Sequence, residues 1–167
     1  MPLANGNVWN YTCTSGAATK AVTGSGPTYN DTLNLPAGVL PTTLTAVEQT
    51  DGIGNTLISA WILGNSTTTV NPIGSELGPT VVSSGSTPYQ APVNGTISTT
   101  VVNIGSKTVA AGTFNNVYEF KLVDSAPVYA ALGEIDIYAT LGVGAVELDF
   151  PDAATPQTCP LQSYTLH

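Results

Sequence analysis

The sequence contains no arginine, only three lysines and a single histidine, which is the last residue, His167. General acid–base catalysis and phosphate recognition depend heavily on these side chains, so their scarcity argues against many catalytic functions. Eleven acidic residues leave a formal net charge of −8, which repels phosphate backbones and anionic lipid surfaces. The charge balance therefore excludes nucleic acid as a partner.

Charged residues of both signs are also rare. They make up 8% of the chain, against about 25% in an average soluble domain, whereas the hydrophobic fraction of 42% is ordinary. Thr, Ser, Asn and Gly must therefore provide most of the polar surface. A surface of this neutral kind is weakly protected by charge repulsion, which favours a protein that packs against its own copies or sits in a matrix.

Long apolar runs are absent as well. No segment reaches the roughly 20 residues that a membrane-spanning helix needs, so we predict no membrane span. The first residues, Met1 to Ala4, lack the basic and apolar regions of a signal peptide. We therefore expect a secreted protein whose signal peptide is missing from this sequence.

Cys13 and Cys159 are the only cysteines, and neither lies in a metal-binding spacing. We predict a disulfide between them, worth roughly 5 kcal/mol for so long a loop; the alternative is two buried thiols. A disulfide is typical of oxidising compartments. The expected location is extracellular, on the cell surface or in the periplasm.

Hydrophobic residues recur with the period of two that is typical of half-buried strands. Turn formers such as Gly24–Pro27 and Gly142–Gly144 separate the strands. We predict one all-β domain over residues 1–167, either a curved antiparallel sheet, a sandwich or an open barrel of about 8–11 strands. The stretch Pro72–Pro92 is expected to be a long loop or an edge segment. The predicted strands are Val8–Cys13, Leu44–Gln49, Leu57–Leu63, Thr96–Ile104, Phe114–Val123, Glu134–Thr140, Ala145–Phe150 and Leu161–Leu166.

Four short segments, in order along the chain, resemble those of a loose group of bacterial secreted or lipoprotein-like β-proteins of unknown function. They are the G-x-x-W-x-Y start within Leu3–Tyr11, the A-G-T-F segment within Val109–Tyr118, the G-V-G segment within Tyr138–Val146, and the closing Leu161–Tyr164. The chain differs from the group in its few basic residues and its two cysteines. The resemblance implies export and a curved antiparallel sheet, similar in style to periplasmic lipoprotein carriers.

The conspicuous residues of these segments are interpreted as scaffold. Trp9, Tyr11 and Phe114 are predicted to anchor the core, because aromatic side chains bury large areas; the alternative for Trp9 and Tyr11 is a ligand platform. The glycines are predicted to supply a positive φ or a bulge where a strand turns. These glycines are Gly112, Gly142 and Gly144.

Two neighbouring strands carry alternating acids, which leave two alternatives open beside a structural role. Paired carboxylates are sufficient for glycoside hydrolysis, and with Asp152 they offer ligands to calcium. Alternation with apolar residues favours the simpler interpretation that all of these acids point to solvent. No cofactor is predicted, and calcium stays a weak alternative. The acids are Glu134, Asp136, Glu147 and Asp149.

Three functions follow from these observations. The preferred one is a non-catalytic cell-envelope or extracellular domain with a structural or adhesive role, a subunit of a surface assembly whose partner is itself or another surface component. The second is a carrier of an apolar, lipid-like ligand in a pocket lined by Trp61, Phe120 and Leu148. The third is a hydrolase that uses the paired acids.

Self-assembly is predicted to use a sheet edge that lacks charge. Proteins usually protect open edges with lysine or inward-pointing charge, and Thr96–Ile104 and Ser66–Val70 contain neither charge nor proline. We expect one of these segments to pair with a neighbouring copy by strand addition. The residues named for this edge are Thr96, Ile97, Thr100, Val101 and Val102.

Overall fold

The computed structural model describes residues 4–26, 28–36, 43–50, 56–63, 85–89, 95–124 and 133–167. These residues form eleven strands and no helix. The strands are β1 (Val8–Cys13), β2 (Gly16–Ser25), β3 (Thr28–Asn34), β4 (Thr43–Thr50), β5 (Thr56–Leu63), β6 (Gly85–Tyr89), β7 (Gly95–Val109), β8 (Gly112–Asp124), β9 (Glu134–Thr140), β10 (Gly144–Phe150) and β11 (Gln157–Thr165). The predicted all-β class is therefore confirmed.

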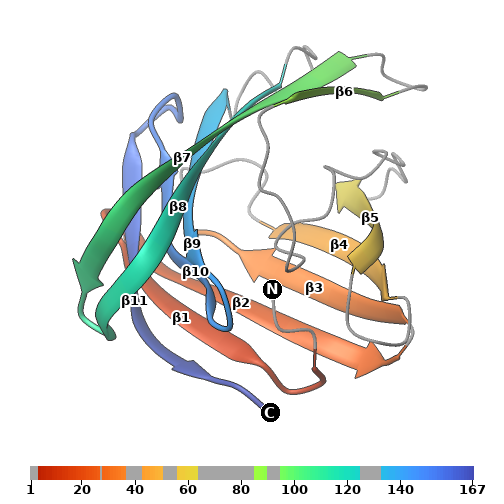
Figure 1. Ribbon diagram of the computed structural model, residues 1–167, viewed down its shortest axis with the longest axis horizontal. Helices are drawn as coiled ribbons and strands as arrows, with labels where there is room; N and C mark the ends of the chain where they lie inside the picture. The colour runs from red at the N-terminus through yellow and green to blue at the C-terminus, as the bar shows by residue number, and fades with distance from the viewer. Residues whose placement is uncertain are drawn as a thin grey trace.

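All eleven strands belong to one antiparallel sheet, in the order β5-β4-β3-β2-β1-β11-β10-β9-β8-β7-β6. Figure 1 shows that this sheet is strongly curved and does not close, with β5 and β6 as its two end strands. The first and last strands of the chain, β1 and β11, meet in the middle of the order, and every other neighbour is consecutive in sequence. Of the predicted architectures, the structure has the curved single sheet and not a two-sheet sandwich.

One face of this sheet, here called the core face, carries the buried hydrophobic side chains. Trp9 is fully buried and Tyr11 nearly so, and Leu161 lies directly opposite Tyr11 on the next strand. Period-two alternation brings these residues together with those of β2, β3 and β10. The largest members of the resulting cluster are Trp9, Tyr11, Val22, Leu33, Leu148, Phe150 and Leu161.

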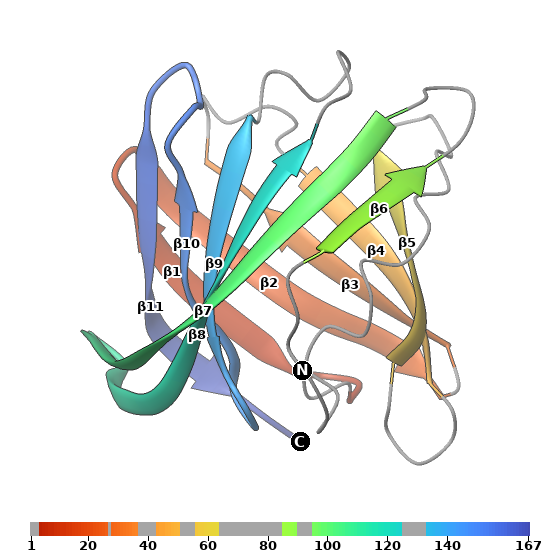
Figure 2. The same cartoon turned by 45° about the horizontal axis from the view of Figure 1, so that its top comes forward.

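The β7–β8 hairpin is longer than the strands beside it, and Figure 2 shows that it curls at its tip. Register shifts between Asn103 and Ser106 bend β7, as bulges do. Past the bend, the tip reaches β11, where the Ala111 amide donates to the Leu161 carbonyl at 3.1 Å. Phe114 also lies against Tyr164, with ring centroids 6.2 Å apart.

Most of the predicted strands coincide with observed ones, including Glu134–Thr140, which is identical to β9. The prediction omitted β2, β3 and β6. β6 lies within Pro72–Pro92, the stretch that is expected to be a long loop or an edge segment, and it is the last strand in the sheet order. Pro88 in β6 is compatible with that place, because proline lacks an amide donor and is tolerated in edge strands.

Within the described part of the chain, no helix is long and apolar enough to span a membrane.

Candidate functional site

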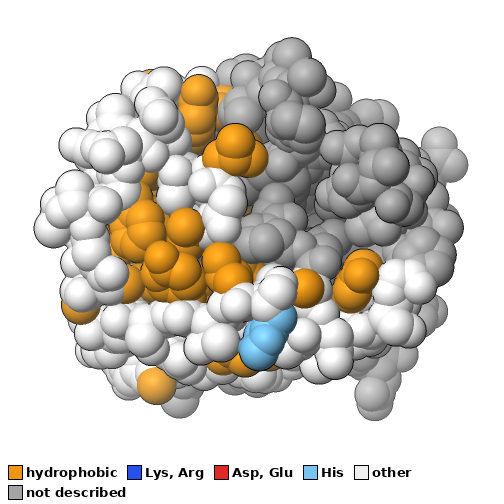
Figure 3. All heavy atoms as spheres, turned by 60° about the horizontal axis from the view of Figure 1, so that its bottom comes forward, with side chains coloured by type: hydrophobic (Ala, Val, Ile, Leu, Met, Phe, Trp, Pro, Cys, Tyr) orange, Lys and Arg blue, Asp and Glu red, His pale blue; other side chains and the backbone are white. Residues whose placement is uncertain are grey.

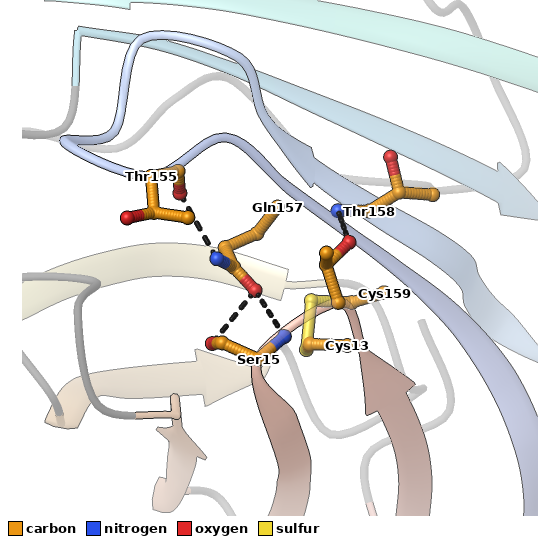
Figure 4. Close-up of a disulfide and its surroundings, with 7 residues drawn as sticks. Cys13, Ser15, Thr155, Gln157, Thr158 and Cys159 are labelled. Atoms are coloured by element: carbon orange, nitrogen blue, oxygen red, sulfur yellow. Dashed lines mark hydrogen bonds between the residues drawn. A yellow bond between two sulfur atoms is a disulfide. The ribbon is translucent and has the colours of Figure 1, made fainter.

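The structure joins Cys13 at the end of β1 to Cys159 near the start of β11, as the sequence predicts. Figure 4 shows the disulfide beside the buried side chain of Gln157. The Gln157 amide oxygen accepts from the Ser15 amide at 2.9 Å and from its hydroxyl at 2.8 Å, and the amide nitrogen donates to the Thr155 carbonyl. The disulfide and these hydrogen bonds together tie the two central strands at one end.

Trp9 and Tyr11 are both part of the core. The Trp9 indole nitrogen donates to the Val143 carbonyl at 2.7 Å, and the Tyr11 hydroxyl donates to the Ala145 carbonyl at 3.0 Å. Both polar groups are therefore satisfied by the backbone around the start of β10, as buried polar atoms require. Neither ring is exposed, so Trp9 and Tyr11 offer no accessible surface on which a ligand could lie.

A buried ion pair lies among these aromatic residues. Lys20 on β2 pairs with Asp31 on β3, and its ammonium also lies 4.8 Å from the centre of the Trp9 ring. Asp31 is 4% exposed. Burial first, and then the charge of Asp31, raise the pKa of Tyr11, so this hydroxyl stays protonated and remains a hydrogen-bond donor.

The predicted scaffold residues of the other segments occupy turns and the hairpin tip. Phe114 is half-buried and packs against the core cluster. Gly112, Gly142 and Gly144 all have positive φ, as predicted. The requirement is clearest at Gly142, with φ of 81° in the β9–β10 turn, because L-residues other than Asn and Asp rarely adopt this conformation.

The edge prediction is wrong for Thr96 and Ile97. They pair with Pro88 and Thr87 of β6, which therefore covers the first part of β7. Among the described residues this pairing reaches Thr99 of β7, and β7 itself continues to Val109. Ser66–Val70 lies outside the described residues.

The part of β7 that lies just beyond β6, Thr100–Ile104, is here called the outer segment. Thr100 and Asn103 are exposed, Val102 is 48% exposed and Ile104 is 37% exposed, while Val101 is half-buried and makes an interaction of its own. The outer segment therefore presents uncharged and partly apolar side chains next to the end of β6.

The face opposite the core face is here called the acidic face. Cross-strand pairing places Glu119, Lys121 and Val123 of β8 opposite Tyr138, Asp136 and Glu134 of β9, and Tyr138 and Asp136 opposite Glu147 and Asp149 of β10. The expectation that these acids all point to open solvent is wrong. Asp136 is 8% exposed and Glu147 is 9% exposed, while Glu134 and Asp149 are half-buried.

For Glu147 the physical reason is the curled tip of the β7–β8 hairpin, which contacts this face. Its Lys107 ammonium lies 2.8 Å from Glu147 and 3.6 Å from the centre of the Tyr138 ring. The Tyr138 hydroxyl in turn donates to Glu119 at 3.0 Å, and the Thr140 hydroxyl donates to the Asn115 carbonyl at 2.9 Å. Lys107 therefore holds the hairpin onto β9 and β10 through one ion pair and one cation–π contact.

Replacing Lys107 by methionine is expected to lower the free energy of unfolding by about 2 kcal/mol, because it leaves Glu147 buried and unpaired. The matched control is Lys121→Met. Lys121 pairs with Glu134 at 2.8 Å, but its side chain is 42% exposed, against 20% for Lys107, so its loss is expected to lower the free energy of unfolding by less than the loss of Lys107 does. Urea unfolding of both variants measures the difference. Equal effects would show that Lys107 does not clamp the hairpin.

The electrostatics of the acidic face are dominated by carboxylates. Burial, followed by the charge of Glu147, raises the pKa of Asp149 to about 6. Burial also raises the pKa of Asp136, and the hydrogen bond to Glu134 raises that of Lys121. Among the described residues, three side-chain oxygens are buried without a hydrogen-bond partner, and two belong to this face, namely Oδ1 of Asp136 and Oδ1 of Asp149.

The calcium alternative finds no support in the described part of the chain, where no group of three acidic, histidine or cysteine side chains can hold a metal ion. Of the predicted carrier pocket, Leu148 is buried in the core and Phe120 is half-buried. The side chain of Trp61 lies outside the described residues. The prediction of an apolar pocket lined by these three residues therefore stays untested.

One end of the molecule presents apolar side chains without charge. In Figure 3, hydrophobic side chains gather near His167, and none of the described side chains in view belongs to Lys, Arg, Asp or Glu. Of the large hydrophobic residues whose burial the structure describes, Leu141 in the β9–β10 turn is the most exposed, at 68%, and Tyr164 near the carboxyl end is 39% exposed. The His167 amide is held by the side chain of Asn7 at 2.8 Å.

Sequence reasoning missed the roles of Lys107 and Tyr138. Alternation within β8 and β9 places Glu119, Lys121 and Tyr138 on one face, which was an available signal for a polar cluster. No local signal places Lys107 on that cluster, because its partners belong to other strands and meet it only after the hairpin curls over.

Comparisons of the chain with protein-family models, with curated proteins and with solved structures find no match. The resemblance of its four segments to exported bacterial proteins therefore stays a prediction.

Proposed function

We propose that this chain is a non-catalytic β-domain of the cell envelope or the extracellular space, with a structural or adhesive role, and that it self-assembles by strand addition at the outer segment of β7. The observation that carries the proposal is the exposure of Thr100, Val102 and Ile104 on β7, just after Thr99, the last residue of β7 that pairs with the described residues of β6. A strand that continues beyond its neighbour offers main-chain groups to a further strand.

The length of the proposed contact is limited by the fold. The register shift that begins at Asn103 bends β7, and the Gly105 amide donates to the Asn103 side chain at 2.8 Å. Bulges of this kind interrupt regular pairing. A copy that adds a strand is therefore expected to pair with the residues before the bend, so that the contact is short and reversible.

The charge distribution supports a contact at this place. All three lysines contact carboxylates of their own chain, Lys20 with Asp31, Lys107 with Glu147 and Lys121 with Glu134. The protein therefore has little positive surface with which to attract an acidic copy of itself. Two molecules of net charge −8 meet most easily through a segment that carries no charge.

A non-catalytic role is supported by the ion pairing and the burial of the carboxylates that a hydrolase would need. Glu147 and Glu134 are each ion-paired at 2.8 Å, and Asp136 is buried. Export is supported by the disulfide, which is compatible with an oxidising extracellular or periplasmic location.

The proposal predicts that the protein associates reversibly, and more strongly as salt screens its negative charge. Sedimentation velocity over a range of protein concentrations, at low and at physiological salt, measures this. Thr100→Lys and Val102→Lys place a charge on the outer segment and are expected to return the protein to a monomer. The matched control is Thr23→Lys, which adds the same charge at an exposed position of β2 and is expected to associate like the parent.

A monomer at every salt concentration, for the parent and all three variants, contradicts the proposal. The carrier of an apolar ligand then becomes the leading candidate, and native mass spectrometry of the purified protein tests it by the mass of any retained lipid.

A further inference from the structure

Two aspartates lie directly opposite each other on the acidic face. Asp136 on β9 is the cross-strand partner of Asp149 on β10. Directly opposed side chains have Cβ atoms about 5 Å apart, and like charges in such a pair are destabilising. Each aspartate also has an Oδ1 that is buried and accepts no hydrogen bond. The pair therefore combines mutual repulsion with incomplete solvation.

Neighbouring groups compensate this charge only in part, through the charge of Lys121 near Asp136, the charge of Lys107 near Asp149 and a hydrogen bond from Thr158 to Asp149. The two lysines make their shortest contacts elsewhere, Lys107 with Glu147 and Lys121 with Glu134, both at 2.8 Å, and Lys121 is 3.9 Å from Oδ1 of Asp136. The remaining groups around the pair, in the part of the chain that the structure describes, carry negative charge or none. The groups that face the pair are Glu147 from β10, Glu134 and Tyr138 from β9, Glu119 and Lys121 from β8, Lys107 from β7, Thr158 from β11, and Asp152 from the turn after β10.

We propose that Asp136 and Asp149 form an acid-responsive pair, which binds one proton from the solvent as the pH falls and thereby strengthens the pairing of β9 with β10. The uptake changes the charge of the pair from −2 to −1. It also converts one carboxylate, which can only accept hydrogen bonds, into a carboxyl group that can donate one. One proton thus relieves the repulsion and supplies a donor at the place where two acceptors have none.

The sign of the effect on stability follows from linkage. The folded pair holds its proton up to about pH 6, the pKa to which burial raises Asp149, whereas an aspartate in the unfolded chain releases it near 3.8. Between these values the folded state binds more protons than the unfolded state, so the free energy of unfolding rises as the pH falls through this window. The raised pKa of Asp136 acts in the same direction. This device is independent of the proposed self-assembly.

The test is a carbon-detected NMR titration of the side-chain carboxyl groups, combined with urea unfolding between pH 4.5 and 7. In the parent protein we expect one of the two aspartates to titrate with a midpoint near pH 6, and the urea midpoint to rise as the pH is lowered. Asp149→Asn is expected to remove that titration and to weaken the rise of the urea midpoint at low pH, leaving only the part that comes from Asp136, whose pKa burial raises.

The matched control is Asp152→Asn, which removes an exposed carboxylate of the same region and keeps an acceptor for the Glu134 amide. It is expected to leave both the titration and the pH dependence in place. The proposal is overturned if all carboxyl groups of the parent titrate below pH 5, or if Asp149→Asn retains the parent's pH dependence. Should Asp149→Asn not fold, the titration of the parent decides alone.

Discussion

Replacing Trp9 by alanine is expected to lower the free energy of unfolding by about 4 kcal/mol. The Trp9 side chain is fully buried in the core face, so its removal leaves a cavity among well-packed neighbours. The variant also leaves the Val143 carbonyl without its donor and removes the ring on which Lys20 rests. For a chain of this length, such a loss lowers the melting temperature by roughly 8–15 °C, which calorimetry or circular dichroism measures.

Two controls separate these contributions. Trp9→Phe keeps most of the apolar area and loses the indole donor, so it is expected to cost about 1–2 kcal/mol. Tyr164→Ala removes an aromatic ring that is 39% exposed and is expected to cost about 1 kcal/mol or less. A melting temperature of Trp9→Ala within one or two degrees of the parent would mean that Trp9 does not anchor the core, and the ligand-platform interpretation would then return.

Removal of the disulfide is expected to cost about 5 kcal/mol by loop-closure entropy, because the linked cysteines are 146 positions apart in sequence. The Cys13→Ala/Cys159→Ala variant, unfolded in urea, measures this loss, and the parent protein in the presence of reductant should unfold near the same urea concentration. Alkylation of the unreduced, denatured parent should label neither cysteine.

A local perturbation beside the disulfide serves as its control. Ser15→Ala removes the hydroxyl that donates to Gln157 at 2.8 Å and leaves the amide that donates to the same oxygen. Its expected cost is about 1 kcal/mol. If the double cysteine variant costs no more than Ser15→Ala, the linkage adds nothing to the hydrogen bonds that already join the two central strands.

The β2 and β3 strands illustrate why sequence patterns predict some elements and miss others. In β9 and β10, apolar and charged residues alternate in an obvious way, and both strands were predicted close to their observed bounds. In β2 and β3, two positions of the core face are taken by Lys20 and Asp31. A buried charge interrupts the apolar alternation, and only the partner on the next strand makes its burial acceptable.

The acidic face shows that sequence patterns predict which face a side chain occupies but not whether that face is buried. Alternation correctly separates Glu147 and Asp149 from Leu148 and Phe150, because side chains of a strand alternate between faces whatever surrounds them. Whether the outward face meets solvent depends on segments distant in sequence. The curled hairpin tip brings Lys107 of β7 to Glu147 of β10. The sequence of neither strand by itself predicts this contact.

The sequence by itself determined the all-β class, the disulfide partners and the turn glycines, because backbone periodicity, cysteine number and positive φ are local or countable properties. The tertiary structure alone decided which part of β7 extends beyond its neighbour, which acids are buried, and which aspartates oppose each other. Each of these depends on the pairing register between strands, and register is set by how the whole sheet buries its core face.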